Sequence, residues 1–465
     1  MPKRKTLMTA PEITPALLAK YDRPGPRYTS YPTVPEWTDA FGGSQYRDAL
    51  REAAGAVDAP LSLYVHIPFC AQRCAYCGCN TVTAPVEHKV SRYLEDVEAE
   101  INRVAALLGG RKTVTQCHWG GGTPTYLDEA RMRRLFQSLT DRFAFDADAE
   151  IAVETNPNAV TDSQLETLRG LGFNRISFGV QDLNPEVQRA VGRCQTPEQT
   201  EAMLARCRAL GFGGINMDLI YGLPLQAMEP WMRTIEQVAA MRPDRIAVYS
   251  YAHLPSRFEH QRALDGLPRP DTAEKYALFA AARNRLIEAG YRPIGMDHFA
   301  LPGDELARSL DNRTLHRNFM GYTVRQAPDQ IGFGGSAISE VADCYSQNTK
   351  DLDLYHESLA KGEFPVERGM ALSREDVIRR WVIRRLMCAF EVDLAQLNGL
   401  FDIDGEAYFS KERALLEAYR DEGMIDLQPD CWRVTPLGAP FIRNLCMVFD
   451  AYLKNTGKAL FSRTI

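Results

Sequence analysis

A cluster of four cysteines within ten residues is the feature that most constrains this chain. Three of them, Cys70, Cys74 and Cys77, are separated by three and then two residues, and Cys79 follows closely. They come directly after the apolar run Leu63–Phe69, which predicts a buried strand. The cysteines therefore lie in a loop at the carboxyl end of that strand. Thiolates are soft ligands that suit zinc or iron–sulfur clusters.

Three interpretations of this loop compete: an iron–sulfur cluster, a zinc site and scattered buried thiols. A structural zinc site normally has a fourth ligand and often a second Cys-x-x-Cys pair, and the sequence contains no second pair. A cubane cluster held by only three cysteines keeps one iron open for a substrate or cofactor. The spacing favours the cluster, with Cys70, Cys74 and Cys77 as ligands of a [4Fe–4S] centre.

Composition is that of a soluble globular protein. The chain has 465 residues, of which 45% are hydrophobic and 25% charged, which is enough for two to three domains. A net charge of −6 argues against a dominant nucleic-acid role. No apolar run is long enough to cross a membrane, and the basic start Met1–Lys5 lacks the apolar segment of a signal peptide.

Cysteine usage predicts a reducing cytoplasm. The chain has 11 cysteines, an odd number, and their crowding into one loop does not resemble a disulfide framework. The remaining seven are expected to be buried apolar fillers: Cys117, Cys194, Cys207, Cys344, Cys388, Cys431 and Cys446.

Residues 1–60 are predicted to form an N-terminal arm without a long periodic pattern. Within it, Tyr21–Pro32 carries three tyrosines, two arginines and two prolines around a glycine. Such a segment is stiff and extended. It could be a surface arm, but its aromatic and cationic side chains suit packing into a pocket.

Strands and helices alternate through the first part of the predicted catalytic region, 61–368. The predicted strands are Leu63–Pro68, Gln116–Trp119, Glu150–Thr155, Arg175–Gln181, Ile215–Tyr221, Arg245–Tyr251 and Pro293–Phe299. The helical patterns between them are Val90–Leu108, Leu165–Gly172, Pro197–Leu210, Ala227–Met241 and Ala273–Ala289. Repeated βα units indicate a parallel sheet with right-handed crossovers, and six units would make a partial barrel.

Small or polar residues follow the strands of this predicted barrel. Chemistry in parallel α/β folds gathers at the carboxyl ends of the strands. Besides the cysteine loop, those ends carry Gly120–Thr123, Glu154, Gln181, Asp218 and Ala252. A buried acid such as Glu154 needs a partner, for which a ribose diol or a structural ion pair would serve.

The remainder of the chain is predicted to be irregular and then helical. Residues 301–368 show no regular pattern, and the glycine-rich segment Gly332–Ser339 suits a simple turn. Residues 369–465 are predicted to form a small, mostly helical, winged-helix-like domain. Its predicted elements are helices Asp376–Phe390, Leu394–Leu400, Gly405–Glu422 and Leu437–Leu453, and a hairpin of Met424–Leu427 with Trp432–Val434. Four arginines are expected to form a solvated helix face rather than a DNA-binding surface: Arg379, Arg380, Arg384 and Arg385.

The extended spacing Cys-x3-Cys-x2-Cys-x-Cys, with Tyr64 and His66 ahead of it, resembles that of a family of radical S-adenosylmethionine (SAM) enzymes, the oxygen-independent coproporphyrinogen III oxidases (coproporphyrinogen dehydrogenases). The resemblance extends over nearly the whole chain. The other similar segments are Tyr21–Pro32, Ser177–Asp182, Gln188–Arg193, Asn216–Pro224, Arg443–Cys446 and Phe449–Leu453.

The resemblance implies a (β/α)6 radical SAM barrel and two SAM molecules. The first, chelated by the open iron, would be contacted by Tyr64, Gly121, Glu154 and Ile338. The second would be contacted by Tyr76, Gly122, Thr123, Gln181, Arg193, Asp218 and Ala252. Tyr76 departs from the family, which often has phenylalanine there. Cys79 is implied to matter for activity without binding iron.

The implied reaction is oxidative decarboxylation of two propionates of coproporphyrinogen III to vinyls, giving protoporphyrinogen IX in haem biosynthesis. It would need a reducing donor such as a flavodoxin or ferredoxin, with the protein acting as a cytoplasmic monomer. Arg27 in the arm is expected to pair with a propionate. Two alternatives remain open: a haem-carrying chaperone of the same superfamily, and a nucleic-acid-binding iron–sulfur protein that uses the C-terminal domain.

Overall fold

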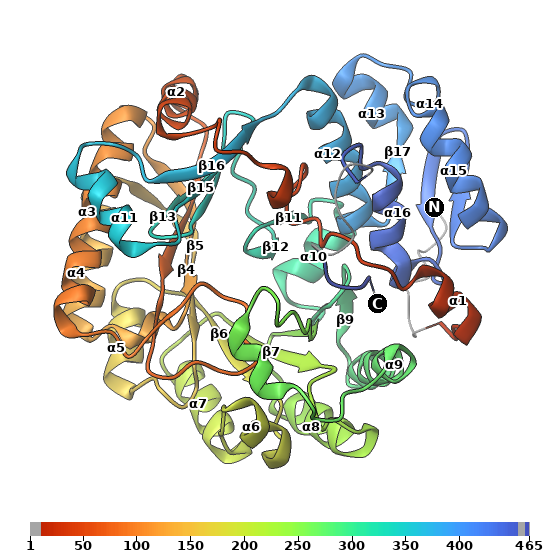
Figure 1. The fold of residues 1–465 in the computed structure, drawn as a ribbon, viewed down its shortest axis with the longest axis horizontal. Coiled ribbons are helices and arrows are strands. Elements are labelled where there is room, and N and C mark those ends of the chain that lie inside the picture. The colour runs from red at the N-terminus through yellow and green to blue at the C-terminus, as the bar shows by residue number, and fades with distance from the viewer. Residues whose placement is uncertain (1–10, 454–460, 465) are drawn as a thin grey trace.

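The computed structural model describes residues 11–453 and 461–464. Its centre is a curved sheet of 12 strands in the order β16-β15-β14-β13-β1-β4-β5-β6-β7-β8-β10-β9, and helices cover the outer face (Figure 1). Six strands form the predicted parallel series: β1 (Leu61–Ile67), β4 (Thr113–Gly121), β5 (Ala144–Thr155), β6 (Arg175–Gln181), β7 (Gly214–Tyr221) and β8 (Arg245–Ser250). The predicted α/β fold with a (β/α)6 partial barrel is confirmed.

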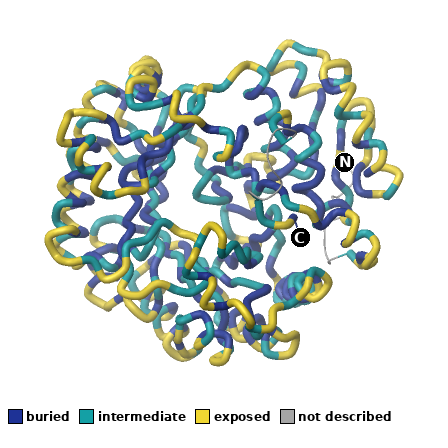
Figure 2. The backbone as a smooth tube through the Cα atoms, in the orientation of Figure 1, coloured by how far each residue is buried: buried dark blue, intermediate teal, exposed yellow. Residues whose placement is uncertain are grey.

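The outer helices bury apolar side chains, most of them against this sheet, whereas those of α6 (Pro185–Val191) pack in a small cluster of their own. The other outer helices are α3 (Glu87–Leu108), α4 (Glu129–Thr140), α5 (Asp162–Gly170), α7 (Pro197–Ala209), α8 (Met228–Met241) and α9 (Thr272–Glu288). In α3, Val90, Leu94, Val97 and Ile101 recur at helical spacing and are all buried. Figure 2 shows the result: buried strands in the middle and exposed residues on the outer surface of the helices.

The predicted strand Pro293–Phe299 is wrong, because the chain turns back within it. β9 (Arg292–Ile294) and β10 (His298–Ala300) form an antiparallel hairpin, and β10 also pairs antiparallel with β8. Gly295 at φ +58° lies in the turn, where an added Cβ would come within 2.0 Å of the Tyr322 ring. This hairpin ends the parallel series at one edge.

Residues 301–368 are more regular than predicted. They contain α10 (Glu305–Asp311), α11 (Leu352–Ala360), β11 (His316–Asn318), β12 (Gly321–Thr323), β13 (Asp329–Phe333), β14 (Ile338–Val341) and β15 (Cys344–Asn348), and β16 (Val366–Ala371) follows. The glycine-rich segment begins inside β13, which pairs parallel with β1. Gly332 is required there, because an added Cβ would lie 2.5 Å from the Ile338 carbonyl oxygen.

The C-terminal region consists of helices around a small three-stranded sheet. The helices are α12 (Arg374–Ala389), α13 (Leu394–Phe401), α14 (Gly405–Tyr408), α15 (Ser410–Asp421) and α16 (Ile442–Val448). The predicted hairpin is confirmed as β18 (Ile425–Leu427) with β19 (Cys431–Val434), and β17 (Glu391–Asp393) pairs with β19 on its other side. The predicted last helix is shorter than expected, ending at Val448.

The N-terminal arm packs against this C-terminal region. After α1 (Pro15–Tyr21), the arm runs between the barrel and the C-terminal helices and then enters α2 (Gly43–Ala53) (Figure 1). Tyr28 and Tyr31 are buried in the same apolar core as α12 and α16. Arg443 donates through Nε to the carbonyl oxygen of Pro26, at 2.9 Å. The boundaries predicted at residues 60 and 368 stay a prediction.

The predicted solvated arginine face on α12 is wrong. Arg380 and Arg384 are largely buried and both pair with Glu340 on β14, at 2.9 and 2.6 Å. Arg379 pairs with Glu375 and Glu412. Arg380 and Arg384 thereby join the C-terminal region to the sheet, whereas Arg379 pairs within the C-terminal region. A buried guanidinium needs such a carboxylate partner.

Two further findings concern the burial of the scattered cysteines and the character of the helices. Cys194 is exposed, so it is not a buried filler, and Cys344 and Cys431 are only partly buried. None of the helices in residues 11–453 and 461–464 combines the length and the apolar character that a bilayer span requires.

Candidate active site

The cysteine loop lies at the carboxyl end of β1, as predicted. Each of the three candidate ligands has a polar neighbour from the barrel rim or from the loop. Thr123 Oγ1 is 3.5 Å from Cys70 Sγ, and Arg193 Nη1 is 3.7 Å from Cys74 Sγ. The backbone N–H of Cys79 donates to Cys77 Sγ at 3.4 Å.

These neighbours favour a thiolate at Cys77. Hydrogen bonds from the side chain and backbone of Cys79, together with the charges of Arg73 and Arg193, lower the pKa of Cys77 to about 6, although burial opposes them. The same contact and burial raise the pKa of Cys79. Because a thiolate is the form that binds metal, the loop is suited to ligation through Cys77 rather than Cys79.

The three thiols of Cys70, Cys74 and Cys77 provide the ligand type and number of an iron–sulfur cluster that keeps one iron open. Within residues 11–453 and 461–464, no three His, Cys, Asp or Glu side chains converge around one point as ligands of one ion would. In a cubane cluster, each of three thiolates binds a different iron, so the sulfur atoms stand further apart.

The glycines after β4 bring the backbone close to the cysteine loop. Gly122 N–H donates to the carbonyl oxygen of Ile67 at 2.8 Å, and an added Cβ would lie 2.7 Å from the carbonyl carbon of Pro68. Gly121 has φ +114°, and its added Cβ would clash with the His66 ring at 2.6 Å. Only glycine fits at these two positions.

Tyr64 and His66 form a hydrogen-bonded pair on β1. Tyr64 Oη lies 3.1 Å from His66 Nδ1, and His66 Nε2 lies 3.0 Å from the carbonyl oxygen of Asn80. Tyr64 is the register partner of Gly332, and Gly332 lies against Ile338. The structure therefore brings Tyr64 and Ile338, which are far apart in sequence, to the same edge of the barrel mouth.

Glu154 has a protein partner on the neighbouring strand. Its Oε1 lies 3.0 Å from His118 Nε2, and Gly121 N–H donates to Oε2 at 3.4 Å. Although burial opposes it, the hydrogen bond from His118 lowers the pKa of Glu154. The lowered pKa favours the carboxylate form, and the side chain is 44% exposed. The ion pair and a ribose-binding role are compatible.

Gln181 and Arg193 meet at the end of β6. Gln181 has φ +69°, and its buried Oε1 has no hydrogen-bond partner. Arg193 donates to the carbonyl oxygen of Gly179 through Nε at 2.9 Å. A strained backbone with an unsatisfied buried oxygen is a feature of ligand-binding positions.

Asp218 lies on β7 and faces the barrel interior. It accepts hydrogen bonds from Ser177 Oγ at 3.0 Å and Asn216 Nδ2 at 2.8 Å. Burial, and then the charge of Glu154, raises the pKa of Asp218 to about 6. The effect of Glu154 shows that the two carboxylates share one electrostatic environment.

Tyr76 and Ala252 are tied together by one side chain. Gln261 Nε2 donates to the carbonyl oxygens of Tyr76 at 3.0 Å and Ala252 at 3.3 Å. Tyr76 itself packs in a small apolar cluster with Val187 and Leu223. Its ring therefore forms part of the barrel mouth on the side of β6 and β7.

One cavity inside the barrel connects several of these residues. It has a volume of about 110 Å³ and is lined by Glu154 and Asp218 from the predicted set. It is also lined by His118, Tyr249 and His298, which the sequence analysis missed. The inward alternation of Gln116 and His118 on β4 would have indicated one of them.

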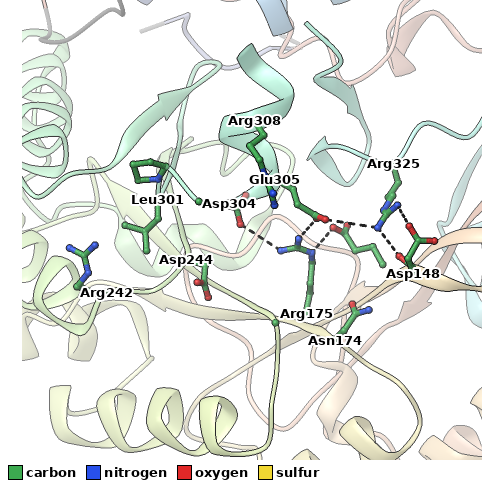
Figure 3. A pocket seen from close by; sticks show the side chains of 14 residues that line it. Asp148, Asn174, Arg175, Arg242, Asp244, Leu301, Asp304, Glu305, Arg308 and Arg325 are labelled. Atoms are coloured by element: carbon green, nitrogen blue, oxygen red, sulfur yellow. Dashed lines mark hydrogen bonds and ion pairs between the residues drawn. The ribbon is translucent and has the colours of Figure 1, made fainter. Parts of the chain in front are cut away.

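A larger cavity of about 640 Å³ lies at the opposite end of the barrel (Figure 3). Charged pairs fill its wall: Arg175 contacts Glu150, Asp304 and Glu305, and Arg325 contacts Asp148 at 2.7 Å. Because Glu150 and Arg175 line both cavities, this network closes the bottom of the barrel.

Arg27 reaches from the arm to the barrel. Its Nη2 donates to the carbonyl oxygen of Ser250, at the end of β8, at 3.4 Å. The neighbouring Tyr28 points the other way, and its hydroxyl donates to Asp450 at 2.9 Å. The arm thus has one face toward the C-terminal core and presents Arg27 to the barrel.

Comparison with known proteins gives matches along almost the whole chain. Residues 64–238 match the model of the radical SAM superfamily, and residues 372–441 match that of the HemN C-terminal domain. The oxygen-independent coproporphyrinogen III oxidase of Escherichia coli is 44% identical over 97% of this chain and 98% of its own length. That of Pseudomonas aeruginosa is 42% identical over the same shares.

A solved structure agrees with these matches. The structure of coproporphyrinogen III oxidase (HemN) from Escherichia coli, described as a radical SAM enzyme, has a TM-score of 0.88 and 44% sequence identity to this chain. It covers 92% of this chain and 97% of its own.

Proposed function

Because the chain belongs to the family of oxygen-independent coproporphyrinogen III oxidases within the radical SAM superfamily, we propose that its barrel rim carries out that family's reaction with the residues described above. The reaction is oxidative decarboxylation of two propionate side chains of coproporphyrinogen III to vinyl groups, giving protoporphyrinogen IX in anaerobic haem biosynthesis. The observation that carries the assignment is the convergence of the cysteine loop with Glu154, Arg193 and Asp218 at one rim.

The cofactors are a [4Fe–4S] cluster and SAM. We assign Cys70, Cys74 and Cys77 as the cluster ligands. Held there, the reduced cluster and SAM would supply the radical chemistry by which each propionate would lose a β-hydrogen, carbon dioxide and one electron. The protein binds, orients and shields the reactants.

We propose that the rim binds two SAM molecules. We propose that the first SAM contacts the residues near β1 and β4, namely Tyr64, Gly121, Glu154 and Ile338. The second contacts the residues around the ends of β6, β7 and β8 and the glycine loop, namely Tyr76, Gly122, Thr123, Gln181, Arg193, Asp218 and Ala252. The unsatisfied oxygen of Gln181 supports this second site.

Cys79 contributes to activity through Cys77 in this proposal. Its hydrogen bonds favour the thiolate of Cys77, so it supports ligation without binding iron. Hydrogen bonds to a metal ligand from residues that do not themselves bind the metal tune a metal site.

We also propose that the arm covers the substrate and that Arg27 pairs with a propionate. The position of Arg27 beside the end of β8 supports this role, because it projects toward the barrel while its neighbours bury in the C-terminal core. A cover that excludes water protects a carbon radical.

The partners and setting are proposed on chemical grounds. Reduction of the cluster requires a low-potential electron donor such as a flavodoxin or ferredoxin. A reducing cytoplasm suits a chain with free cysteines and an exposed metal-binding loop. We propose a monomer, since one chain contains every residue assigned to the site.

The alternative functions have less support. A nucleic-acid-binding role rested on the α12 arginines, but Arg380 and Arg384 are committed to Glu340. The arm Pro24–Pro32 and Cys79, both present here, are generally lacking in the haem-carrying chaperones of the superfamily. Anaerobic incubation of reconstituted protein with SAM, a reductant and coproporphyrinogen III tests the proposed function directly, with product masses as the readout.

A further inference from the structure

We propose that Lys275 and Arg27 together bind a carboxylate group of the tetrapyrrole substrate at the end of β8. The inference rests on the proposed function, which assigns Arg27 but not Lys275. Lys275 lies near the start of α9, and its Nζ donates to the carbonyl oxygen of Tyr251 at 3.1 Å. Arg27 donates to the carbonyl oxygen of Ser250, the preceding residue. Two cations, one from the barrel and one from the arm, therefore stand beside consecutive residues of the same chain segment.

The end of β7 is shaped to admit the Lys275 side chain. Gly222 follows β7 with φ +81°, and an added Cβ there would lie 2.8 Å from Lys275 Cε. Glycine at this position leaves room for the aliphatic stem. The ammonium group lies 5.9 Å from the centre of the Tyr221 ring. The charge of Lys275 is therefore held at the carboxyl ends of β7 and β8, where the proposed site residues gather.

Lys275 and Arg27 belong to a group of three cations that have no carboxylate partner. The third is Arg443, which is 6% exposed and donates to the carbonyl oxygens of Pro26 at 2.9 Å and Arg463 at 2.7 Å. In the part of the chain that the structure describes, none of the three forms an ion pair with a carboxylate. Lys275 and Arg27 are only partly buried, so a ligand can reach them. Cations held away from bulk water are normally paired with an anion, which this group lacks.

Two carboxylates whose charges act on this group do not neutralise it. Asp22 pairs with Arg463, and Asp297 lies 2.7 Å from His298 Nδ1. Burial and neighbouring cations lower the pKa of Lys275 to about 8, although the charge of Asp22 opposes them. The ammonium form still predominates at neutral pH. Positive charge thus remains in excess, and a carboxylate that enters reduces the repulsion among the three cations.

A substrate carboxylate is the anion that fits this position. Coproporphyrinogen III carries four carboxylates, and the arm that presents Arg27 is the proposed cover of the substrate. A carboxylate that accepts hydrogen bonds from both Lys275 and Arg27 would join the arm to the barrel, so binding of the substrate would draw the arm over it. Ala252, which follows Tyr251, belongs to the proposed second SAM site. A propionate held by the two cations therefore lies beside that site.

Binding of coproporphyrin III, the air-stable oxidised ring with the same four propionates, measures the interaction without turnover. We expect Lys275→Met to weaken binding about ten- to a hundredfold, since a charge-assisted hydrogen bond is lost. Lys275→Arg should keep most of the affinity, because it preserves the charge. Arg285→Met is the matched control, because Arg285 lies on the same helix and contacts Glu236 on α8, at 3.8 Å. SAM binding should stay unchanged in all three variants.

A double variant tests whether one carboxylate contacts both cations. In that case Arg27→Met combined with Lys275→Met should weaken binding of coproporphyrin III by less than the product of the two single factors. Losses that simply multiply would overturn the shared carboxylate.

The tetramethyl ester of coproporphyrin III separates a carboxylate contact from a general loss of packing. The ester should bind the unmodified protein and Lys275→Met equally, because it has no charged group to lose. Unchanged binding of coproporphyrin III to Lys275→Met would overturn the proposal, and so would an equal loss with the ester. Loss of SAM binding in Lys275→Met would overturn it too, because the anion would then belong to SAM. Failure of the proposed function would be separate, since it would appear as absent turnover in the unmodified protein.

Discussion

Arg193 and Cys74 are in contact across the mouth of the barrel, with Nη1 of Arg193 3.7 Å from Sγ of Cys74. Because Arg193 also donates to the carbonyl oxygen of Gly179, the side chain ties the cysteine loop to the fourth strand of the parallel series. The loop is therefore held in place by the barrel itself as well as by any metal that it binds. This connection joins the proposed cluster to the proposed second SAM site.

Removing a cluster ligand should abolish the iron chromophore. We expect Cys70→Ala, Cys74→Ala and Cys77→Ala each to lose it after anaerobic reconstitution, whereas Cys79→Ala should keep most of it. Iron and sulfide analysis with visible absorption gives the measurement. Cys194→Ala is the control, since Cys194 is exposed and not among the proposed ligands. Equal losses in all four loop variants would reject the three-ligand assignment.

Glu154 and Asp218 should serve different SAM molecules. We expect two sites in equilibrium binding to the reconstituted protein, one lost in Glu154→Ala and the other in Asp218→Ala. A single site in the unmodified protein would contradict this account.

The two SAM sites should also differ in their pH dependence. Burial and the charge of Glu154 raise the pKa of Asp218 to about 6, and the ionised form is the better acceptor for ribose hydroxyls. Affinity at the second site should therefore be about tenfold weaker at pH 5 than at pH 7. The pKa of Glu154 is lowered, so the first site should vary less over this range. Asp218→Asn should remove the dependence, and a pH-independent second site in the unmodified protein would count against the assignment.

Arg27 can be tested without removing the arm. Deleting residues 1–32 should stop vinyl formation and keep the cluster and SAM binding, but it would also uncover the core that buries Tyr28 and Tyr31. Arg27→Met keeps that core covered. We expect this variant to raise KM for coproporphyrinogen III at least tenfold without changing Tm or SAM binding. Arg23→Met is the matched control, because Arg23 contacts Tyr419 in the C-terminal region instead of the barrel. If both variants react at the normal rate, the arm only packs.

Glu340 should hold the C-terminal region to the barrel. Glu340→Gln leaves the largely buried Arg384 without a charged partner and Arg380 with Asp343 alone, so we expect the free energy of unfolding to fall by about 3–5 kcal/mol. Denaturant titration measures this change. Glu357→Gln, which removes an exposed pair with Lys361, should cost less than about 1 kcal/mol. Similar losses of unfolding free energy in the two variants would show that the ion pairs of Glu340 stabilise the protein no more than an exposed pair does.

The sequence predicted the parallel series because each strand is apolar and each helix amphipathic. It failed where local pattern and tertiary packing diverge. The turn predicted for Gly332–Ser339 is limited to its middle, because Gly332 lies in β13 and allows close packing against Ile338. The sequence does not indicate that Arg380 and Arg384 are buried, because their partner Glu340 lies 40 and 44 residues away along the chain.

The candidate site was predictable only in part for the same reason. The cysteine loop and Glu154 are marked by spacing and by their place after strands. His298 is not marked in this way, since the turn at Gly295 reverses the chain within the single predicted strand Pro293–Phe299. Tyr249 lies inside another predicted strand, Arg245–Tyr251. Only the fold brings β8 and β10 together so that both side chains line one cavity.

The central claim is that this chain decarboxylates coproporphyrinogen III by radical chemistry. The most direct measurement is anaerobic incubation of the reconstituted protein with SAM, a reductant and coproporphyrinogen III, followed by mass analysis, with Cys77→Ala as the control. The account predicts protoporphyrinogen IX, with both propionates converted to vinyls, together with methionine, 5′-deoxyadenosine and carbon dioxide, and none of these in Cys77→Ala. Cleavage of SAM that leaves coproporphyrinogen III unchanged, or equal conversion by Cys77→Ala, would contradict it.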